Sequence, residues 1–122
     1  MKNGKKKILV VDDEEGLTRM LKWNLEASGY EIRVLNESIH ALEAAKAFGP
    51  DLIIMDWMMP VLTGSETAGR LKNDPAVRQI PIIFLTGMAV DEETKSPDMP
   101  YCLAKPVDLT RLISCIEERL AA

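Results

Sequence analysis

Five polar residues that could do chemistry each follow a short apolar run in this 122-residue sequence. Asp12 and Asp13 follow the first run, Asp56 follows a later one, and Thr86 and Lys105 follow two more. Carboxylates about 4 Å apart repel by roughly 4 kcal/mol per pair at an effective dielectric of 20, so three of them need protons or a cation. Mg²⁺ prefers such oxygen ligands and usually completes its shell with water and phosphate oxygens. The residue types therefore favour a phosphoryl-accepting site with Asp56 as a weak anionic nucleophile.

Taken one at a time, these residues have ordinary structural explanations. Asp56 could end a strand and start a turn, and Asp12 and Asp13 could favour the start of a helix. Thr86 could be a turn hydroxyl, and Lys105 an edge residue whose stem packs on the surface. These independent explanations account poorly for polar residues at four strand ends at once. Together, Lys105 would neutralise one phosphoryl oxygen and the Thr86 hydroxyl would bond another.

The elements that would position these residues alternate between strand and helix patterns. Short aliphatic runs predict strands at 8–11, 32–35, 52–55, 80–85 and 101–104. Apolar residues at helical spacing predict helices at 17–28, 38–48, 65–73 and 109–120. The stretch between Thr86 and Lys105 has no such spacing, so we expect its helix to be short, at 91–95, or missing. Such alternation predicts an α/β fold with a parallel sheet covered on both faces and right-handed crossovers. With the strand order 2-1-3-4-5, the three carboxylates would converge at the switch point between strands one and three.

Length and composition predict one soluble domain. A chain with 47% hydrophobic residues can bury a single core, and its net charge of -4 gives no overall attraction to nucleic acid or to anionic membranes. Four lysines lie in residues 1–7, which we interpret as a basic tail before a domain at 8–122. No run resembles a membrane span or a signal-peptide core, so we expect a cytoplasmic protein. Cys102 and Cys115 lack metal-site spacing and are predicted to be buried thiols.

Four motifs point to one family. They are V-V-D-D-E at 10–14, I-M-D-W-M-M-P-V-L-T-G at 54–64, L-T-G at 85–87 and A-K-P at 104–106. In this order, and at the ends of the predicted strands, they resemble the receiver domain of two-component response regulators over residues 8–120. The resemblance implies a flavodoxin-like (CheY-like) three-layer sandwich with a five-stranded parallel sheet.

The resemblance also implies a role for each site residue. Asp56 would be the phosphorylated aspartate. Asp13 and Asp56 would bind Mg²⁺ directly, Asp12 would assist through water, and the Met58 backbone carbonyl would be a further ligand. Lys105 and Thr86 would contact the phosphoryl group, and the Lys105-Pro106 peptide bond would be cis.

Partners follow from the same resemblance. The phosphohistidine of a histidine kinase or phosphotransfer protein would be the donor, and a downstream protein target or an attached output domain would receive the signal. The protein would not be an enzyme beyond self-phosphorylation and self-dephosphorylation. No effector domain follows the last helix, so the chain is expected to be a stand-alone receiver or a fragment, and a homodimer formed on phosphorylation is left open.

Three departures from the family pattern are visible. Many members carry an aromatic switch residue three positions before the lysine, where this chain has Cys102, and Tyr101 beside it would face the other side of its strand. The stretch between Thr86 and Lys105 is a few residues shorter than usual. Met58 and Met88 stand two residues after Asp56 and Thr86, where neither can orient a water molecule through a polar side chain. We therefore predict slow self-dephosphorylation.

The same residues bear on three alternative functions. An aspartate-nucleophile phosphatase of the haloacid dehalogenase type would carry a second Asp where Met58 stands. A flavodoxin-like mononucleotide binder would want a Ser/Thr/Gly-rich phosphate loop where residues 12–15 would repel phosphate. The serious alternative is a degenerate receiver that acts as a phosphorylation-independent interaction module.

Overall fold

Five parallel strands form one sheet in the order β2-β1-β3-β4-β5. This computed structural model describes residues 4–87 and 102–121. The strands are β1 Lys7–Val11, β2 Glu31–Leu35, β3 Leu52–Asp56, β4 Ile82–Thr86 and β5 Cys102–Ala104. Because every pairing is parallel, the carboxyl ends of the strands meet at one edge. The predicted α/β fold and strand order are confirmed.

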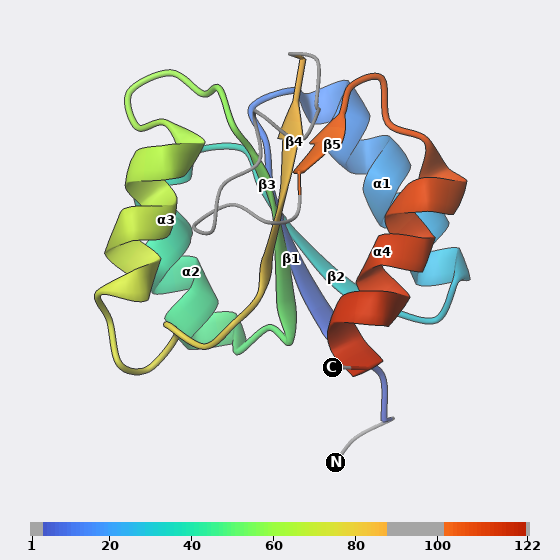
Figure 1. The fold of residues 1–122 in the computed structure, drawn as a ribbon, viewed down its shortest axis with the longest axis horizontal. Coiled ribbons are helices and arrows are strands. Elements are labelled where there is room, and N and C mark those ends of the chain that lie inside the picture. The colour runs from blue at the N-terminus through green and yellow to red at the C-terminus, as the bar shows by residue number, and fades with distance from the viewer. Residues whose placement is uncertain (1–3, 88–101, 122) are drawn as a thin grey trace.

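Helices cover both faces of this sheet (Figure 1). The described helices are α1 Glu15–Ala27, η1 Ser38–His40, α2 Ala41–Phe48, α3 Gly64–Lys72 and α4 Leu109–Ala121. α1 and α4 lie on one face, and α2 and α3 lie on the other, which gives the predicted three-layer sandwich. The expected short helix near 91–95 lies outside the described residues. Among the described helices, none is long and apolar enough to cross a membrane.

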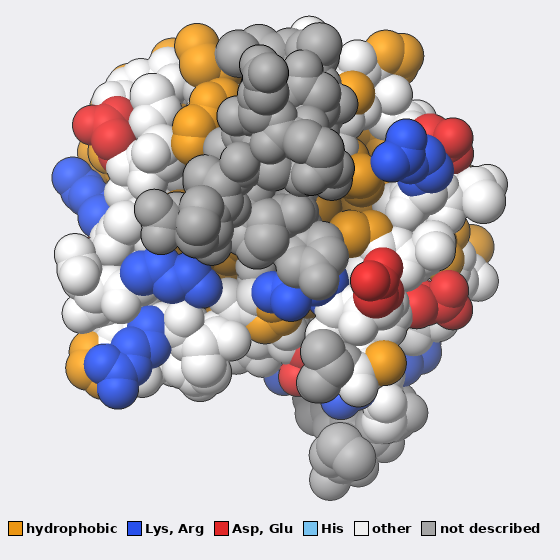
Figure 2. All heavy atoms as spheres, in the orientation of Figure 1, with side chains coloured by type: hydrophobic (Ala, Val, Ile, Leu, Met, Phe, Trp, Pro, Cys, Tyr) orange, Lys and Arg blue, Asp and Glu red, His pale blue; other side chains and the backbone are white. Residues whose placement is uncertain are grey.

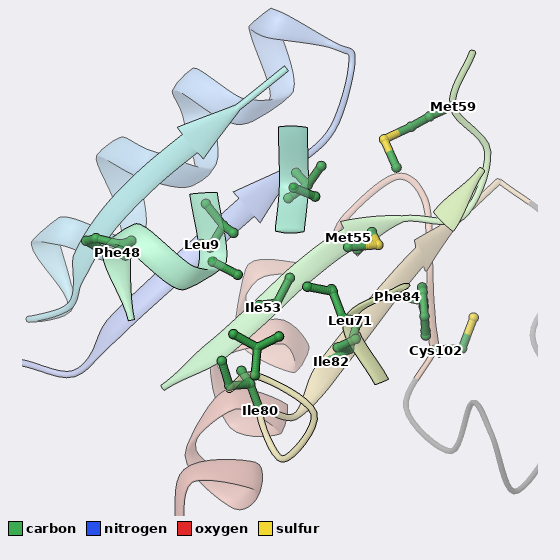
Figure 3. Packing of buried hydrophobic residues seen from close by; sticks show 14 residues of the cluster. Leu9, Phe48, Ile53, Met55, Met59, Leu71, Ile80, Ile82, Phe84 and Cys102 are labelled. Carbon is green, nitrogen blue, oxygen red and sulfur yellow. The ribbon is translucent and has the colours of Figure 1, made fainter. Parts of the chain in front are cut away.

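The two faces of the sheet bury separate hydrophobic clusters. Figure 3 shows the α2/α3 cluster, in which Leu9, Ile53 and Phe84 point from the strands toward the helices. Alternate residues of the same strands, such as Ile8, Ile54 and Leu85, pack on the α1/α4 side. Strands β3 and β4 are buried along their whole length. Because both of their faces are covered, their sequences are continuous aliphatic runs and do not alternate between apolar and polar residues. This buried sheet is a rigid support for the residues that follow each strand.

The cysteines lie on different faces of the sheet. Cys102 is buried in the α2/α3 cluster, as predicted. Cys115 is only partly buried, where it packs against the α1/α4 cluster from α4. The prediction of a buried thiol is therefore not confirmed for Cys115, because this residue lies at the margin of the apolar stripe formed by Leu112 and Ile116.

Several element boundaries differ from the predictions for local reasons. β4 starts at Ile82, since Pro81 has no N–H to donate and the Ile80 N–H bonds to Val77 in the preceding turn. The predicted helix 38–48 begins as the 3₁₀ turn Ser38–His40 before α2. β1 begins at Lys7, one residue earlier than expected.

The ends of three helices follow recognisable capping rules. α2 ends at Gly49, whose φ of 65° suits the left-handed conformation that glycine adopts easily. α4 begins after Asp108, whose carboxylate accepts a hydrogen bond from the Arg111 N–H as a predicted N-cap should. α3 begins with a reciprocal capping box between Thr63 and Glu66, which the sequence reading had not identified.

Charged side chains of both signs share the face shown in Figure 2. Where described side chains are visible, basic residues gather around the carboxyl-terminal end of α3, and acidic residues lie over α4. Arg70 and Lys72 are in the last turn of α3, while Glu117 and Glu118 are in α4. The visible part of this face therefore carries positive charge over α3 and negative charge over α4.

Candidate functional site

Asp12 is held rigidly at the carboxyl end of β1. Its backbone N–H donates to the Leu35 carbonyl at 3.1 Å, and its own carbonyl accepts a 2.8 Å hydrogen bond from the Asn36 side chain. The Glu14 backbone N–H donates to Asp12 Oδ1 at 2.9 Å, which fixes the carboxylate itself. Asp12 is completely buried. A carboxylate held in a buried position with a shifted pKa is a candidate for function.

Asp56 is the last residue of β3, and its side chain is held almost out of contact with solvent. The chain continues the ladder for one more step, because the Trp57 N–H donates to the Leu85 carbonyl at 2.8 Å. The Met58 N–H donates to Asp56 Oδ1 at 3.3 Å. Gly64, at the start of α3, comes so close that a Cβ there would collide with the Asp56 carbonyl oxygen. The strand, the following loop and α3 together therefore fix the position of Asp56.

The three predicted carboxylates converge. Oxygen atoms of Asp12, Asp13 and Asp56 all lie within 4.8 Å of one another, although Asp56 is more than forty residues from the other two. Asp13 is exposed, whereas Asp12 and Asp56 are buried. Asp12 Oδ2 is buried, and the polar group described beside it is the Lys105 ammonium at 3.1 Å. Two buried carboxylates and an exposed third, facing a single ammonium group, fit a hard divalent cation that keeps part of its water shell.

Lys105 directly follows β5 and faces this acidic cluster. The Lys105 N–H donates to the Thr86 carbonyl at 2.7 Å, so the last residue of β4 and the first residue after β5 are adjacent. The Lys105-Pro106 peptide bond is cis, as predicted. The Lys105 Nζ atom lies 3.1 Å from Asp12 Oδ2 and 3.3 Å from Asp56 Oδ1. Thr86 is buried at the end of β4, where its backbone meets Lys105.

The closest carboxylate to Lys105 is one that the sequence reading did not propose. Lys105 Nζ donates to Glu14 Oε1 at 2.9 Å, which is shorter than its distances to Asp12 and Asp56. Glu14 belongs to the acidic run at residues 12–15, so its charge was visible in the sequence. Nothing in the run distinguishes Glu14 from its neighbour Glu15, because the contact joins residues 91 positions apart.

Burial and neighbouring charges shift the pKa values of Asp56, Asp12 and Lys105. Burial, with the nearby Asp12 carboxylate, raises the pKa of Asp56 to about 6, against the opposing attraction of Lys105. Burial also raises the pKa of Asp12, although the Glu14 N–H and Lys105 oppose it. Burial alone would lower the pKa of Lys105, but its contacts with Glu14, Asp12 and Asp56 raise it above its ordinary value. The carboxylates thus carry an unfavourable charge that a cation would relieve.

The remaining predicted site residues differ in what the structure says of them. The Met58 side chain is largely exposed, and only its N–H contact with Asp56 is seen, so the carbonyl ligand stays a prediction. Cys102, at the position of the family's aromatic switch, is buried against the α2/α3 cluster. Met88 and Tyr101 lie outside the described residues.

Comparison with known proteins adds independent support. Residues 8–117 match the response regulator receiver domain family. The chain is 32% identical to the polar-differentiation response regulator DivK of Brucella ovis over 118 residues, covering 94% of this chain and 96% of DivK. It is 40% identical to the phosphate regulon transcriptional regulatory protein PhoB of Rhizobium meliloti over 87 residues, which is 71% of this chain but only 38% of PhoB.

A solved structure shows the same arrangement. The receiver domain of a sensor histidine kinase from Pseudomonas aeruginosa superposes with a TM-score of 0.86 at 25% identity, covering 98% of this chain and all of that one, and it holds a magnesium ion in its active-site cleft. The resemblance read from the four motifs is therefore confirmed in fold and in sequence. This chain belongs to the response regulator receiver domain family.

Proposed function

We propose that this protein accepts a phosphoryl group on Asp56 from the phosphohistidine of a histidine kinase or phosphotransfer protein. The observation that carries the proposal is the convergence of the Asp12, Asp13 and Asp56 oxygens within 4.8 Å, with Lys105 Nζ 3.3 Å from Asp56. Such a site supports phosphoryl transfer. Three clustered carboxylates repel one another and destabilise the fold, so their presence favours a functional role over a structural one. The alternative of a degenerate receiver is not favoured, because all five motif residues are present.

Each residue has a distinct task in the proposed reaction. An Asp56 carboxylate oxygen attacks phosphorus, the phosphorus–nitrogen bond of phosphohistidine breaks, and the histidine nitrogen keeps the electron pair. Asp12, Asp13, Asp56 and the Met58 carbonyl would hold Mg²⁺, which supplies charge neutralisation for the anionic donor. Lys105 neutralises a second phosphoryl oxygen.

Thr86 is proposed to couple phosphorylation to output. Its hydroxyl would donate a hydrogen bond to a third phosphoryl oxygen, and its backbone carbonyl already accepts a 2.7 Å hydrogen bond from the Lys105 N–H. The charge added on Asp56 would then pull both residues inward and shift the loops beside them between two arrangements. Thr86→Ala should accordingly leave Asp56 phosphorylation intact while weakening binding to the output partner. Equal loss of both would show that Thr86 acts in phosphoryl transfer instead.

The cellular setting that we propose follows from this chemistry. A phosphohistidine donor implies a cytoplasmic protein, with a downstream protein target or an attached output domain as receiver of the signal. Activity of its own would be limited to self-phosphorylation from small phosphodonors and self-dephosphorylation. The assignment of residues 1–7 as a basic tail before the receiver domain is part of the same proposal.

Incubation with acetyl phosphate and Mg²⁺ tests the proposed function. Intact-protein mass spectrometry should show the gain of one phosphoryl group, and Asp56→Asn should abolish it. Asp51→Asn is the matched control, because Asp51 is exposed just before β3, at the opposite end from Asp56, where it accepts a hydrogen bond from the Lys7 N–H. No mass gain in the wild type would favour the phosphorylation-independent interaction module. An equal gain in Asp56→Asn would refute Asp56 as the acceptor.

A further inference from the structure

Lys105 contacts three carboxylates, and the nearest of them lies outside the proposed metal site. Glu14 Oε1 is 2.9 Å from Lys105 Nζ, compared with 3.1 Å for Asp12 and 3.3 Å for Asp56. Only Asp12 and Asp56 also belong to the cluster that fits a cation. Glu14 therefore touches the lysine of the site without contributing to the cation cluster.

The backbone of Glu14 is fixed, and its side chain is committed to Lys105. The Glu14 N–H donates to Asp12 Oδ1, and the Glu14 carbonyl accepts from the Thr18 N–H in the first turn of α1. Although Glu14 is the N-cap residue of α1, its side chain accepts no hydrogen bond from the helix. Its side chain is 61% exposed, whereas that of Lys105 is 17% exposed. Glu14 thus lies at the solvent-exposed edge of the site and contacts the ammonium group of Lys105.

Lys105 and a divalent cation require the same oxygens. The ammonium group lies against Asp12 Oδ2 and Asp56 Oδ1, and it partly neutralises the charge that would attract a metal ion. A cation that enters this cluster must weaken those two contacts. The displaced ammonium group needs another anionic partner, since it is mostly withdrawn from water. Glu14 is already within hydrogen-bond distance and supplies that partner.

We propose that Glu14 is a positioning residue that draws Lys105 away from Asp12 and Asp56, and so raises the affinity of the site for Mg²⁺. The inference deepens the proposed function and rests on one part of it, the Mg²⁺ site, and not on phosphoryl transfer. Without Glu14, Lys105 stays on the two buried carboxylates and competes with the ion. Because Glu14 is exposed, its ion pair is worth little in free energy, and we expect about a two- to five-fold loss of Mg²⁺ affinity.

A titration of the metal-free protein with MgCl₂ at constant ionic strength tests this proposal. The fluorescence of Trp57, which directly follows Asp56, provides the signal in a Trp23→Phe background that removes the exposed second tryptophan. Glu14→Gln should weaken Mg²⁺ binding about two- to five-fold. Glu15→Gln is the matched control, because it removes the same charge one residue away without a described contact to Lys105.

Two further variants separate contact from charge. Glu14→Asp keeps the charge but is one methylene shorter, so it should bind Mg²⁺ as weakly as Glu14→Gln. In a Lys105→Met background, Glu14→Gln should lower the Mg²⁺ affinity no more than Glu15→Gln does, because the lysine that Glu14 contacts is gone. The proposal is overturned if Glu14→Gln and Glu15→Gln have equal effects, or if the Glu14→Gln effect persists without Lys105.

This experiment is independent of phosphorylation. A wild type that binds Mg²⁺ but gains no phosphoryl group from acetyl phosphate would refute the proposed function and leave the role of Glu14 standing. A wild type that is phosphorylated, with Mg²⁺ affinity unchanged by Glu14→Gln, would refute the role of Glu14 alone.

Discussion

Gly64 and Gly69 lie in the same helix, and we expect alanine at these two positions to have opposite effects on stability. Gly64 is the buried first residue of α3, and its N–H donates to the Trp57 carbonyl at 3.0 Å. A Cβ on Gly64 would collide with the Asp56 carbonyl oxygen and lie 2.9 Å from Trp57 Cα. A Cβ on Gly69 would meet nothing within 4 Å. The same substitution therefore tests close backbone approach at one site and helix propensity at the other.

The two effects can be estimated from these contacts. Alanine at Gly64 must push α3 away from β3, which costs about 1–3 kcal/mol for overpacking and about 1 kcal/mol for the weakened hydrogen bond to Trp57. Alanine at Gly69 should stabilise the exposed helix by about 0.5–1 kcal/mol. For a domain of 122 residues, 1 kcal/mol corresponds to about 4 °C in Tm. We expect Tm to fall by roughly 8–16 °C in Gly64→Ala and to rise by roughly 2–4 °C in Gly69→Ala.

Thermal and urea unfolding of the metal-free protein, followed by far-ultraviolet circular dichroism, would measure both changes. Because the collision involves the backbone of Asp56 itself, Gly64→Ala should also weaken the response of Trp57 fluorescence to Mg²⁺, whereas Gly69→Ala should leave it unchanged. If Gly64→Ala is as stable as the wild type, close packing of α3 on the end of β3 does not constrain the position of Asp56, and the reasoning is refuted.

Three further predictions concern Asp56, the exposed Val61 and the lifetime of the phosphoprotein. Burial raises the pKa of Asp56 from an ordinary 3.8 to about 6, so the ionised group destabilises the metal-free fold. Asp56→Asn should therefore raise the free energy of unfolding by about 1–3 kcal/mol near neutral pH. Measured by urea unfolding, the gain in free energy of unfolding should be absent at a pH below the pKa of Asp56 in the unfolded chain. It should grow as the pH rises to about 6 and then level off, and a gain that does not depend on pH would contradict this reasoning. Val61 is exposed and has a φ of 70°, a backbone conformation that asparagine tolerates better than valine. Val61→Asn should therefore stabilise the protein by about 0.5–1 kcal/mol. An unchanged or lower urea midpoint would show that the valine is not strained. Met58→Asn, combined with a polar residue at Met88, should shorten the lifetime of the phosphoprotein on a phosphate-affinity gel, and unchanged decay would argue against our expectation of slow self-dephosphorylation.

Much of the fold could be predicted because its signals are local. The aliphatic runs of β3 and β4 are bounded by glycine or proline and are buried on both faces, so a short unbroken run was sufficient to identify them. The signals were weaker at element ends, where a single hydrogen bond decides the boundary. The capping box of Thr63 and Glu66 was visible as a spacing in the sequence, but several Ser, Thr and Glu residues compete for such a role.

The sequence by itself placed Asp12, Asp13 and Asp56 at the carboxyl ends of buried parallel strands, which lie at one edge of a sheet, and it predicted that they would meet on the condition that the strand order is 2-1-3-4-5. It determined in the same way that Thr86 and Lys105 would be neighbours of that cluster. These conclusions need only the order of the strands and the identity of the residue at each strand end.

Only the tertiary structure decided which of the adjacent acids Glu14 and Glu15 reaches Lys105, and how closely Gly64 approaches the backbone of Asp56. Both depend on distances of a few ångströms between segments that are far apart in the chain or separated by a loop. Composition, periodicity and spacing carry no information at that scale, because the direction of a side chain is settled by the packing of all the elements around it.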